Sequence, residues 1–301
     1  GGIMPVIGDQ VGLTLDRIVF ATDFSPSAEK AAGYAQGLAK RFSSSLSLAH
    51  VVDSSAAARS ETAAALGLPI DEMRRTSAEN QERLLDEMTL AGVRTTAHTL
   101  ESNNPAAAIV GFARELRADL IVTGTNGRHG LSKAILGSCA EGIIRHASCP
   151  VLTIGPNAKL APKGSFSFHT VVFATDFSSN AALEAAVALS FAQDSVAKIY
   201  LCHVLDRPGK DICKTVELEL KFEEALQQLI PRSTYDWICP ERVVETGEVA
   251  PGILGLAKKV DADLIVLGAK HSGTWYAHLI EGTVGQVLMK AECPVLAVCA
   301  S

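Results

Sequence analysis

Short runs of β-favouring residues alternate with segments of helical periodicity along the chain. Runs at residues 18–22, 46–52, 94–100, 120–123 and 151–154 predict strands. Apolar residues spaced three and four apart predict helices at residues 26–42, 106–117 and 138–146, and the segment 54–92 predicts a short helix followed by a longer one. Regular alternation of strand and helix predicts a parallel sheet with right-handed crossovers.

A strand order of 3-2-1-4-5 would place the topological switch point between the first and fourth strands. Open α/β sheets bind ligands at that point, beyond the carboxyl ends of the strands. Asp23 follows the first strand and Gly124 follows the fourth. We therefore expect a binding site near these two residues.

The second half of the chain repeats the first in the same order. VVFATDFS at residues 171–178 copies IVFATDFS at residues 18–25, and ADLIVLG at 262–268 copies ADLIVTG at 118–124. CHVLD at 202–206 and CPVL at 293–296 copy AHVVD at 49–53 and CPVL at 149–152. This indicates a tandem duplication. We expect two five-stranded, Rossmann-like α/β domains at residues 1–156 and 169–301, with a linker at 157–168 inside the Pro-, Gly- and Lys-containing stretch GPNAKLAPKGSFSF.

The first half carries glycines at the spacing G-x2-G-x9-G-S, formed by Gly124, Gly127, Gly137 and Ser138. Ser138 with Glu141 predicts a capping box at a helix N-terminus. Such a terminus carries partial positive charge, and glycines allow an anion to approach the main chain. The pattern predicts a phosphate site made of backbone, although glycines that serve only tight turns are the alternative. The spacing fits neither the P-loop nor the dinucleotide fingerprint.

This motif resembles the ATP-binding signature of the universal stress protein family, and LSKAILGSCAEGIIRHASCPVLTI at residues 131–154 resembles the end of its domain. The resemblance covers both halves and implies a tandem universal stress protein whose domains pack as a pseudo-dimer through strands 151–154 and 295–298. It implies ATP in the first half. A nucleotide's phosphates generally bring Mg²⁺, held mostly by phosphate oxygens and water. The nucleotide-binding residues would be Asp23, Val51, Thr123, Gly124, Gly127, Arg128, Gly137 and Ser138.

In the second half the glycine pattern is eroded. His271 stands at the place of the middle glycine, Gly273 comes two residues later, and Thr283 with Gln286 repeats the capping-box pattern. Because a non-glycine residue rarely allows close approach of the backbone to a phosphate, we expect weak ATP binding here or none. In the rival view, Gly273 takes over that role in a reshaped loop. The doubtful second site consists of Asp176, Val204, Gly268, Gly273, Gly282 and Thr283.

Composition narrows the class of protein. The chain has 301 residues, of which 48% are hydrophobic and 20% charged, with a net charge of −6, as expected for a soluble globular protein. We expect neither a nucleic-acid polymer nor a membrane as partner, since no basic stripe and no apolar run of spanning length occurs. The seven cysteines include no C-x-x-C pair, which favours free thiols and a cytoplasmic location.

No catalytic residue or metal ligand emerges, because neither a Ser-His-Asp pattern nor an H-E-x-x-H motif is present. His50 and His203 lie within apolar strands and are expected to be core residues. The leading hypothesis is an ATP-binding stress-response protein whose nucleotide state alters conformation or the choice of an unidentified protein partner, with at most slow hydrolysis. The alternatives are a nucleotide-free scaffold and an ATP-consuming ligase. The sequence ATDFS at residues 21–25 argues against the ligase, which has a Ser-Gly-Gly-x-Asp-Ser type loop there. Homodimerisation of the whole chain stays open.

Overall fold

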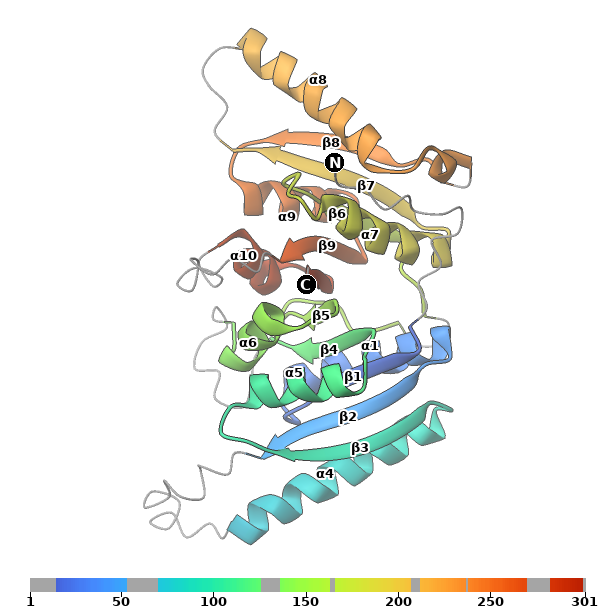
Figure 1. Ribbon diagram of the computed structural model, residues 1–301, viewed down its shortest axis with the longest axis vertical. Helices are drawn as coiled ribbons and strands as arrows, with labels where there is room; N and C mark the ends of the chain where they lie inside the picture. The colour runs from blue at the N-terminus through green and yellow to red at the C-terminus, as the bar shows by residue number, and fades with distance from the viewer. Residues whose placement is uncertain are drawn as a thin grey trace.

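The computed structural model describes residues 15–52, 70–125, 136–162, 166–206, 212–236, 238–269 and 282–299. Strands and helices alternate through the first half (Figure 1). They are β1 (Arg17–Ala21), α1 (Pro26–Phe42), β2 (Ser45–Val52), α4 (Ile70–Leu90), β3 (Arg94–Glu101), α5 (Pro105–Glu115), β4 (Leu120–Gly124), α6 (Ser138–His146) and β5 (Val151–Ile154).

The second half repeats this order and adds a short 3-10 helix, η1. Its elements are β6 (Thr170–Ala174), α7 (Ala181–Ser195), β7 (Lys198–Leu205), α8 (Ile212–Leu229), η1 (Arg232–Asp236), β8 (Glu241–Thr246), α9 (Val249–Lys259), β9 (Leu264–Ala269), α10 (Thr283–Lys290) and β10 (Val295–Cys299). The predicted strands and the three helices of regular periodicity are confirmed, with ends that shift by one or two residues. The short helix predicted after residue 54 lies outside the described residues.

All ten strands form one sheet in the order β3-β2-β1-β4-β5-β10-β9-β6-β7-β8. Pairing is parallel within each half, and β5 pairs with β10 in antiparallel register, with Leu152 opposite Leu296. The order 3-2-1-4-5 is therefore confirmed in both halves, as is their pairing through the last strands.

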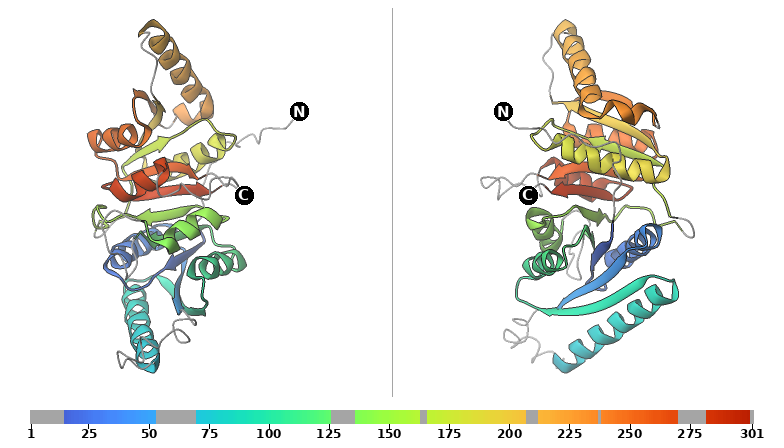
Figure 2. Two further views of the ribbon diagram at one scale, coloured as in Figure 1. Left: turned by 90° about the vertical axis from the view of Figure 1, so that its left-hand side faces the viewer. Right: turned by 45° about the vertical axis from the view of Figure 1, so that its right-hand side comes forward.

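Helices cover both faces of the sheet (Figure 2). Side chains alternate along β1, so Ile18 and Phe20 enter one core while Val19 and Ala21 enter the other. The first core is completed by α1, α4, α7 and α8, and the second by α5, α6, α9 and α10. Each core contains residues of both halves, so the two halves share their hydrophobic interior.

The segment that joins the halves is packed against α1. Lys30 Nζ donates hydrogen bonds to the carbonyl oxygens of Pro156 and Ala158, at 2.9 and 3.2 Å. The Tyr34 hydroxyl donates to the carbonyl oxygen of Lys159 at 3.0 Å. The joining segment is thus held to the first half by side chains of a single helix.

Aromatic rings continue this connection into the second half. Phe166 contacts Tyr34 edge-on at 5.9 Å between ring centroids, and Phe168 at 5.1 Å. Phe168 then contacts Phe191 of α7 at 5.9 Å, and Phe191 contacts Phe42 of α1 at 6.3 Å. Edge-to-face pairs of this kind add to the stabilisation from burial. The rings therefore link α1 and α7 on one face of the sheet.

Candidate functional site

The predicted switch point is present in the first half. β1 lies between β2 and β4, with Ala21 paired to Ala49 on one side and to Thr123 on the other. After β1 the chain turns into α1, and after β4 it leads towards α6. The carboxyl ends of these strands therefore bring Asp23 and Gly124 to the same edge of the sheet, as predicted.

Asp23 takes part in a tight turn between β1 and α1. Phe24 has a φ of 60°, its N–H donates to Thr22 Oγ1 at 3.1 Å, and the N–H of Ser25 donates to Asp23 Oδ1 at 3.0 Å. Ser25 then caps α1, since its hydroxyl accepts from the N–H of Ala28. Asp23 is partly buried, so one carboxylate oxygen is fixed by the turn.

The second half contains the same turn. Phe177 has a φ of 55°, its N–H donates to Thr175 Oγ1 at 3.0 Å, and the N–H of Ser178 donates to Asp176 Oδ1 at 2.9 Å. Because both aspartates shape a turn, Asp176 would be needed for the fold even if the second half bound no nucleotide.

The two strand histidines are structural, as expected. Nδ1 of His50 donates to the carbonyl oxygen of Thr22 at 2.9 Å, and Nδ1 of His203 donates to that of Thr175 at 2.8 Å. The rings also lie against Phe24 and Phe177, with centroids 4.7 and 4.9 Å apart. Each histidine therefore holds the turn that carries the aspartate.

Gly124 is required first by packing. A Cβ atom at this position would lie 2.9 Å from the carbonyl carbon of Ser27 and 3.0 Å from its oxygen. The end of β4 therefore approaches the first turn of α1 more closely than any other residue would allow. The neighbouring Thr123 is buried and donates from Oγ1 to the carbonyl oxygen of Gly124 at 3.3 Å.

The start of α6 differs from the prediction. The N-cap is Gly137, without a side-chain cap, and Ser138 is the first helical residue, so the predicted capping box is wrong. Glu141 instead pairs with Arg145 one turn along the helix. The capping box predicted at Thr283 is wrong for the same reason, because α10 has Gly282 as its N-cap and no side-chain cap. In both halves a glycine is the N-cap, and the predicted capping residue, Ser138 or Thr283, is the first residue of the helix.

This arrangement leaves Ser138 exposed at the N-terminus of α6. The first N–H groups of an α-helix have no partner within the helix and carry partial positive charge. Gly137 is an exception, since its N–H donates to the carbonyl oxygen of Thr125 at 2.7 Å. The anion-binding potential of this site therefore lies in Ser138 and the residues after it.

Sequence reasoning missed Cys139, which lies beside this helix terminus. Burial, together with a smaller contribution from the carboxylate of Asp23, raises the pKa of its thiol to about 11. Gly137 is hydrogen-bonded to Thr125 and Gly124 packs against Ser27, so the start of α6 and the turn that carries Asp23 both adjoin the end of β4. Asp23, Gly124 and Ser138 thus surround one region, with Val51 half-buried in the adjacent strand β2. Gly127, Arg128 and Gly273 lie outside the described residues.

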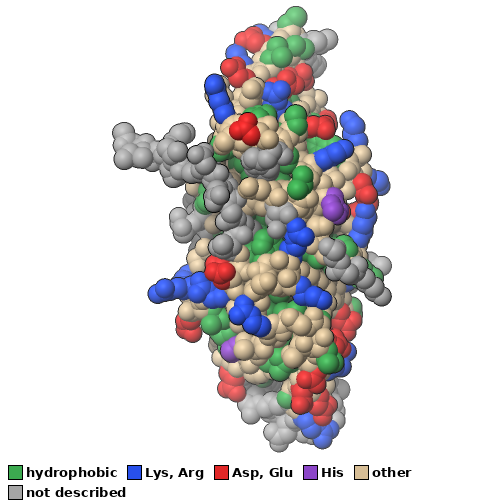
Figure 3. All heavy atoms as spheres, turned by 90° about the vertical axis from the view of Figure 1, so that its right-hand side faces the viewer, with side chains coloured by type: hydrophobic (Ala, Val, Ile, Leu, Met, Phe, Trp, Pro, Cys, Tyr) green, Lys and Arg blue, Asp and Glu red, His purple; other side chains and the backbone are tan. Residues whose placement is uncertain are grey.

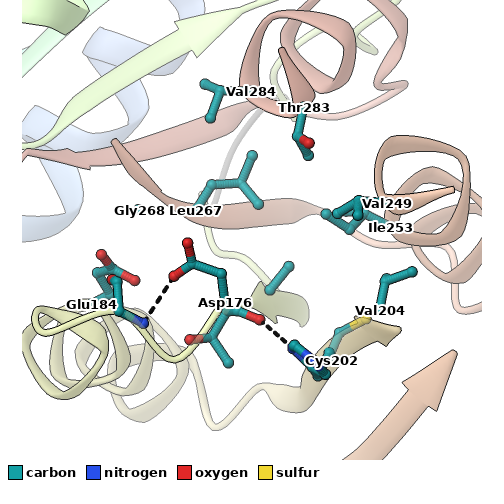
Figure 4. Close-up of a pocket in the computed structure, with 14 residues that line it drawn as sticks. Asp176, Glu184, Cys202, Val204, Val249, Ile253, Leu267, Gly268, Thr283 and Val284 are labelled. Carbon is teal, nitrogen blue, oxygen red and sulfur yellow. Dashed lines mark hydrogen bonds between the residues drawn. The ribbon is translucent and has the colours of Figure 1, made fainter. Parts of the chain in front are cut away.

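A cavity of about 230 Å³ lies at the corresponding place of the second half (Figure 4). Asp176, Val204, Gly268 and Thr283 of the predicted second set line it, and Gly282 directly precedes Thr283. In Figure 1 the arrows of β4 and β9 point to the same side of the molecule, so both candidate sites face that side.

Glu184 of α7 also lines this cavity and was missed from the sequence. The residue is only 4% exposed, and its carboxylate lies over Cα of Gly268, where a Cβ atom would overlap it. The signal was available, because Glu184 follows Asp176 by the same number of residues as Ala31 follows Asp23. A carboxylate thus stands where the first half has a buried alanine.

Other classes of site receive no support from the described residues. Within them, no helix is long and apolar enough to cross a membrane, and no group of three or more His, Cys, Asp and Glu could hold a metal ion. Basic and acidic side chains both occur along the face shown in Figure 3. All seven cysteines lie in described parts of the chain, and none of them forms a disulfide.

Comparison with known proteins identifies relatives of both halves. The model of the Universal stress protein family matches residues 14–155 and 167–298. A universal stress protein of Methanocaldococcus jannaschii is 38% identical over 148 residues, which are 46% of this chain and 81% of the relative. A putative universal stress protein of Staphylococcus aureus strain USA300 is 35% identical over 147 residues, or 47% of this chain and 85% of the relative.

Solved structures share the arrangement over nearly the full length. A universal stress protein from Archaeoglobus fulgidus DSM 4304 has a TM-score of 0.72 at 19% identity, with 97% of this chain and 99% of that chain covered. A putative universal stress protein from Pseudomonas aeruginosa UCBPP-PA14 has a TM-score of 0.61 at 19% identity, with 96% and 94% covered. At 19% identity, the similarity to these two structures shows the fold alone.

Proposed function

The chain belongs to the universal stress protein family, and we propose that its first half binds ATP as part of a nucleotide-dependent regulatory or interaction function in the stress response. The observation that carries the proposal is the position of the α6 N-terminus, which has no side-chain cap and, like the turn that carries Asp23, adjoins the end of β4 at the switch point. Phosphates bind well at such termini, and the site lies where open α/β sheets bind ligands.

Each part of the nucleotide has a candidate contact. The phosphates would lie against the first turn of α6, with Ser138 as a hydroxyl donor. The ribose hydroxyls would donate to the carboxylate of Asp23, and the main chain at Val51 would contact the adenine, as the family resemblance implies. Mg²⁺ would be held by phosphate oxygens and water, because the described residues offer no group of three metal ligands.

The proposed role is regulatory rather than enzymatic. No nucleophile or general base is paired with an orienting group among the described site residues, and both strand histidines are bonded to main-chain carbonyls. A nucleotide changes a protein's conformation or partner only if it contacts two states differently. The segment from Arg128 to Leu136, which stands between two glycines of the motif in the sequence, is the part proposed to respond to the nucleotide.

The repeat offers a matched test with one substitution at two equivalent positions. Asp23→Asn and Asp176→Asn each keep an Oδ1 atom that can accept the turn hydrogen bond, and each removes one charge. Protein freed of copurified nucleotide would be titrated calorimetrically with Mg-ATP, with Mg-GTP as a specificity control. We expect one ATP site, weakened about tenfold or more by Asp23→Asn and unchanged by Asp176→Asn.

Other outcomes would overturn the assignment. Loss of ATP binding in Asp176→Asn alone would move the site to the second half, and two sites would mean that the eroded motif still functions. Absence of ATP binding in the folded wild-type protein would favour the nucleotide-free scaffold.

A further inference from the structure

The pairing of β5 with β10 brings two cysteines opposite each other. Val151 faces Ala297 in this antiparallel register. Continued by two residues beyond that pair, the register sets Cys149 opposite Cys299. Cys299 is the last residue of β10, and Cys149 lies just before β5. The two thiols therefore come from different halves of the chain and lie at the strand pair that joins them (Figure 2).

Both side chains point to the same face of the sheet. Residues that face each other across an antiparallel pair lie on one side of it, and both thiols belong to the core beneath α5, α6, α9 and α10. Cys299 Sγ donates a hydrogen bond to the carbonyl oxygen of Ile144 in the last turn of α6, at 3.3 Å. Cys149 follows the end of α6 by three residues. The end of α6 therefore covers one thiol and leads directly to the other.

The separation that this register sets suits a disulfide. Facing residues of antiparallel strands have Cα atoms about 4.5 or 5.5 Å apart, and disulfides join Cα atoms about 4.4–6.8 Å apart. The two sulfur atoms could therefore bond without a change of register. Burial, followed by the neighbouring Cys149, raises the pKa of Cys299 to about 12, which agrees with two thiols sharing an apolar core.

The repeat supplies a matched cysteine that faces no second thiol. Cys293 copies Cys149 in the motif CPVL, and the two are 4% and 9% exposed. In the register of β5 and β10 the residue opposite Cys293 is Gly155. The cysteine pair is therefore confined to one end of the strand pairing, and Cys293 is a control of similar burial.

We propose that Cys149 and Cys299 are a redox-active pair that closes to a disulfide between the two halves when the protein meets hydrogen peroxide. One sulfur attacks a peroxide oxygen as the thiolate, the O–O bond breaks, and the leaving hydroxide takes that thiol's proton, so that a sulfenic acid and water form. The second sulfur then attacks the sulfenic sulfur, the S–S bond forms, and the displaced hydroxide leaves as water with the second proton. The thiols together lose two protons and two electrons, and one peroxide molecule becomes two water molecules. The proposal does not depend on ATP binding.

Closure of the pair is expected to be slow. Burial raises the pKa of both thiols to about 12, and the thiolate is the form that reacts. Because little thiolate is present at neutral pH, closure should take hours rather than seconds. Such a pair would record prolonged exposure to peroxide rather than a brief pulse.

Peptide mapping of the full-length protein tests the bond. A variant with Cys213→Ser and Cys239→Ser, which lacks the two exposed thiols, would be treated with hydrogen peroxide, alkylated under denaturing conditions and digested with trypsin without reduction. Trypsin releases Cys149 within residues 146–159 and Cys299 within residues 291–301. We expect a linked pair of these peptides, about 2 Da lighter than their sum, which dithiothreitol separates.

Two further variants in this background identify the sulfur atoms, because Cys293 lies in the same peptide as Cys299. Cys299→Ala should abolish the linked pair, and Cys293→Ala should leave it unchanged. Circular dichroism before treatment reports whether each variant is folded. Fragment ions that separate Cys293 from Cys299 give the same assignment without a substitution at either position.

Three results would overturn the proposal. Recovery of Cys149 and Cys299 as alkylated thiols after prolonged treatment would show that the pair is inert. A sulfinic acid at either residue without a linked pair would show that the sulfurs lie too far apart to bond. A link from Cys149 to Cys293 would show that peroxide acts on an unfolded chain rather than on the paired strands.

Discussion

The main-chain N–H of Gly137 donates a hydrogen bond to the carbonyl oxygen of Thr125, with 2.7 Å between the two atoms. This bond joins the end of the glycine-rich segment to its beginning. The N–H of Gly137 is therefore used within the protein, and a bound phosphate would depend on Ser138 and the following N–H groups. Gly137 therefore has two structural roles: it is the N-cap of α6, and its N–H hydrogen bond connects the two ends of the segment.

Ser138→Asp should separate helix stability from nucleotide binding. A carboxylate in the first turn of α6 interacts favourably with the helix dipole, so the free energy of unfolding should rise by about 0.3–1 kcal/mol. The same charge would repel phosphate, so calorimetry should show ATP affinity at least tenfold lower. Thr283→Asp at the start of α10 is the control for the position of the phosphates and should leave ATP binding unchanged. Unchanged ATP affinity in Ser138→Asp would place the phosphates elsewhere.

Gly124→Ala should destabilise the protein by about 1–3 kcal/mol, the usual cost of overpacking. The new Cβ atom would lie 2.9 Å from the carbonyl carbon of Ser27, so β4 and α1 must move apart. Gly111→Ala in α5 is the control, because no atom lies within 4 Å of its Cβ position, and it should stabilise the helix by about 0.5–1 kcal/mol. Urea unfolding measures both changes. Wild-type stability in Gly124→Ala would show that this approach carries no strain.

The contact between Phe166 and Gly37 predicts that Gly37→Ala destabilises the wild type but stabilises a variant that lacks the Phe166 ring. Phe166→Ala should lower the free energy of unfolding by about 3–5 kcal/mol, because it empties a buried position between the halves. Gly37→Ala should destabilise the wild type, since its Cβ atom would overlap the Phe166 ring. In the Phe166→Ala background the same change should stabilise α1. Urea unfolding of the four proteins gives the coupling energy, and additive effects would contradict the contact.

Alkaline pH should weaken the fold through its buried thiols. Burial raises the pKa of Cys202 from 9.0 to about 12, with Glu245 adding to the effect. Between these values the unfolded chain loses a proton that the folded chain retains, so the free energy of unfolding falls as pH rises. The contribution of this thiol to the free energy of unfolding is fully present below about pH 9 and is lost progressively as the pH rises towards 12.

Cys202→Ala tests this dependence, because Ala49 occupies the same position in the first half. Replacing the thiol should reduce the loss of stability between pH 8 and about pH 10.5 by up to about 2 kcal/mol. Cys239→Ala, which removes an exposed thiol, should leave the loss unchanged. Equal pH profiles for wild type and Cys202→Ala would contradict the prediction.

The sequence was sufficient for the fold because each strand and helix carries its own periodic pattern and the repeat supplies every pattern twice. The strand order and the pairing of β5 with β10 followed from topology and family resemblance. The helix starts were less predictable. Ser138 and Thr283 have hydroxyl side chains of the kind that cap helix N-termini, yet the N-cap of each helix is the preceding glycine.

The lining of the second cavity needed three-dimensional information. Glu184 and Gly268 are far apart in sequence, and only packing of α7 on β9 brings the carboxylate over the glycine. The repeat register marks Glu184 as unusual, because an acid interrupts an apolar helix face. It cannot tell whether such an acid points inward or bends towards solvent, because that depends on the space left by Gly268.

The antiparallel pairing of β5 with β10 makes the association of the two halves intramolecular. Two separate copies would dissociate on dilution, whereas here the effective concentration is set by the short joining segment. Each half always meets the same neighbour and never an identical copy of itself across this pairing. Mutations in one half are therefore not imposed on the other, and the two sites are free to specialise while the shared sheet preserves their common architecture.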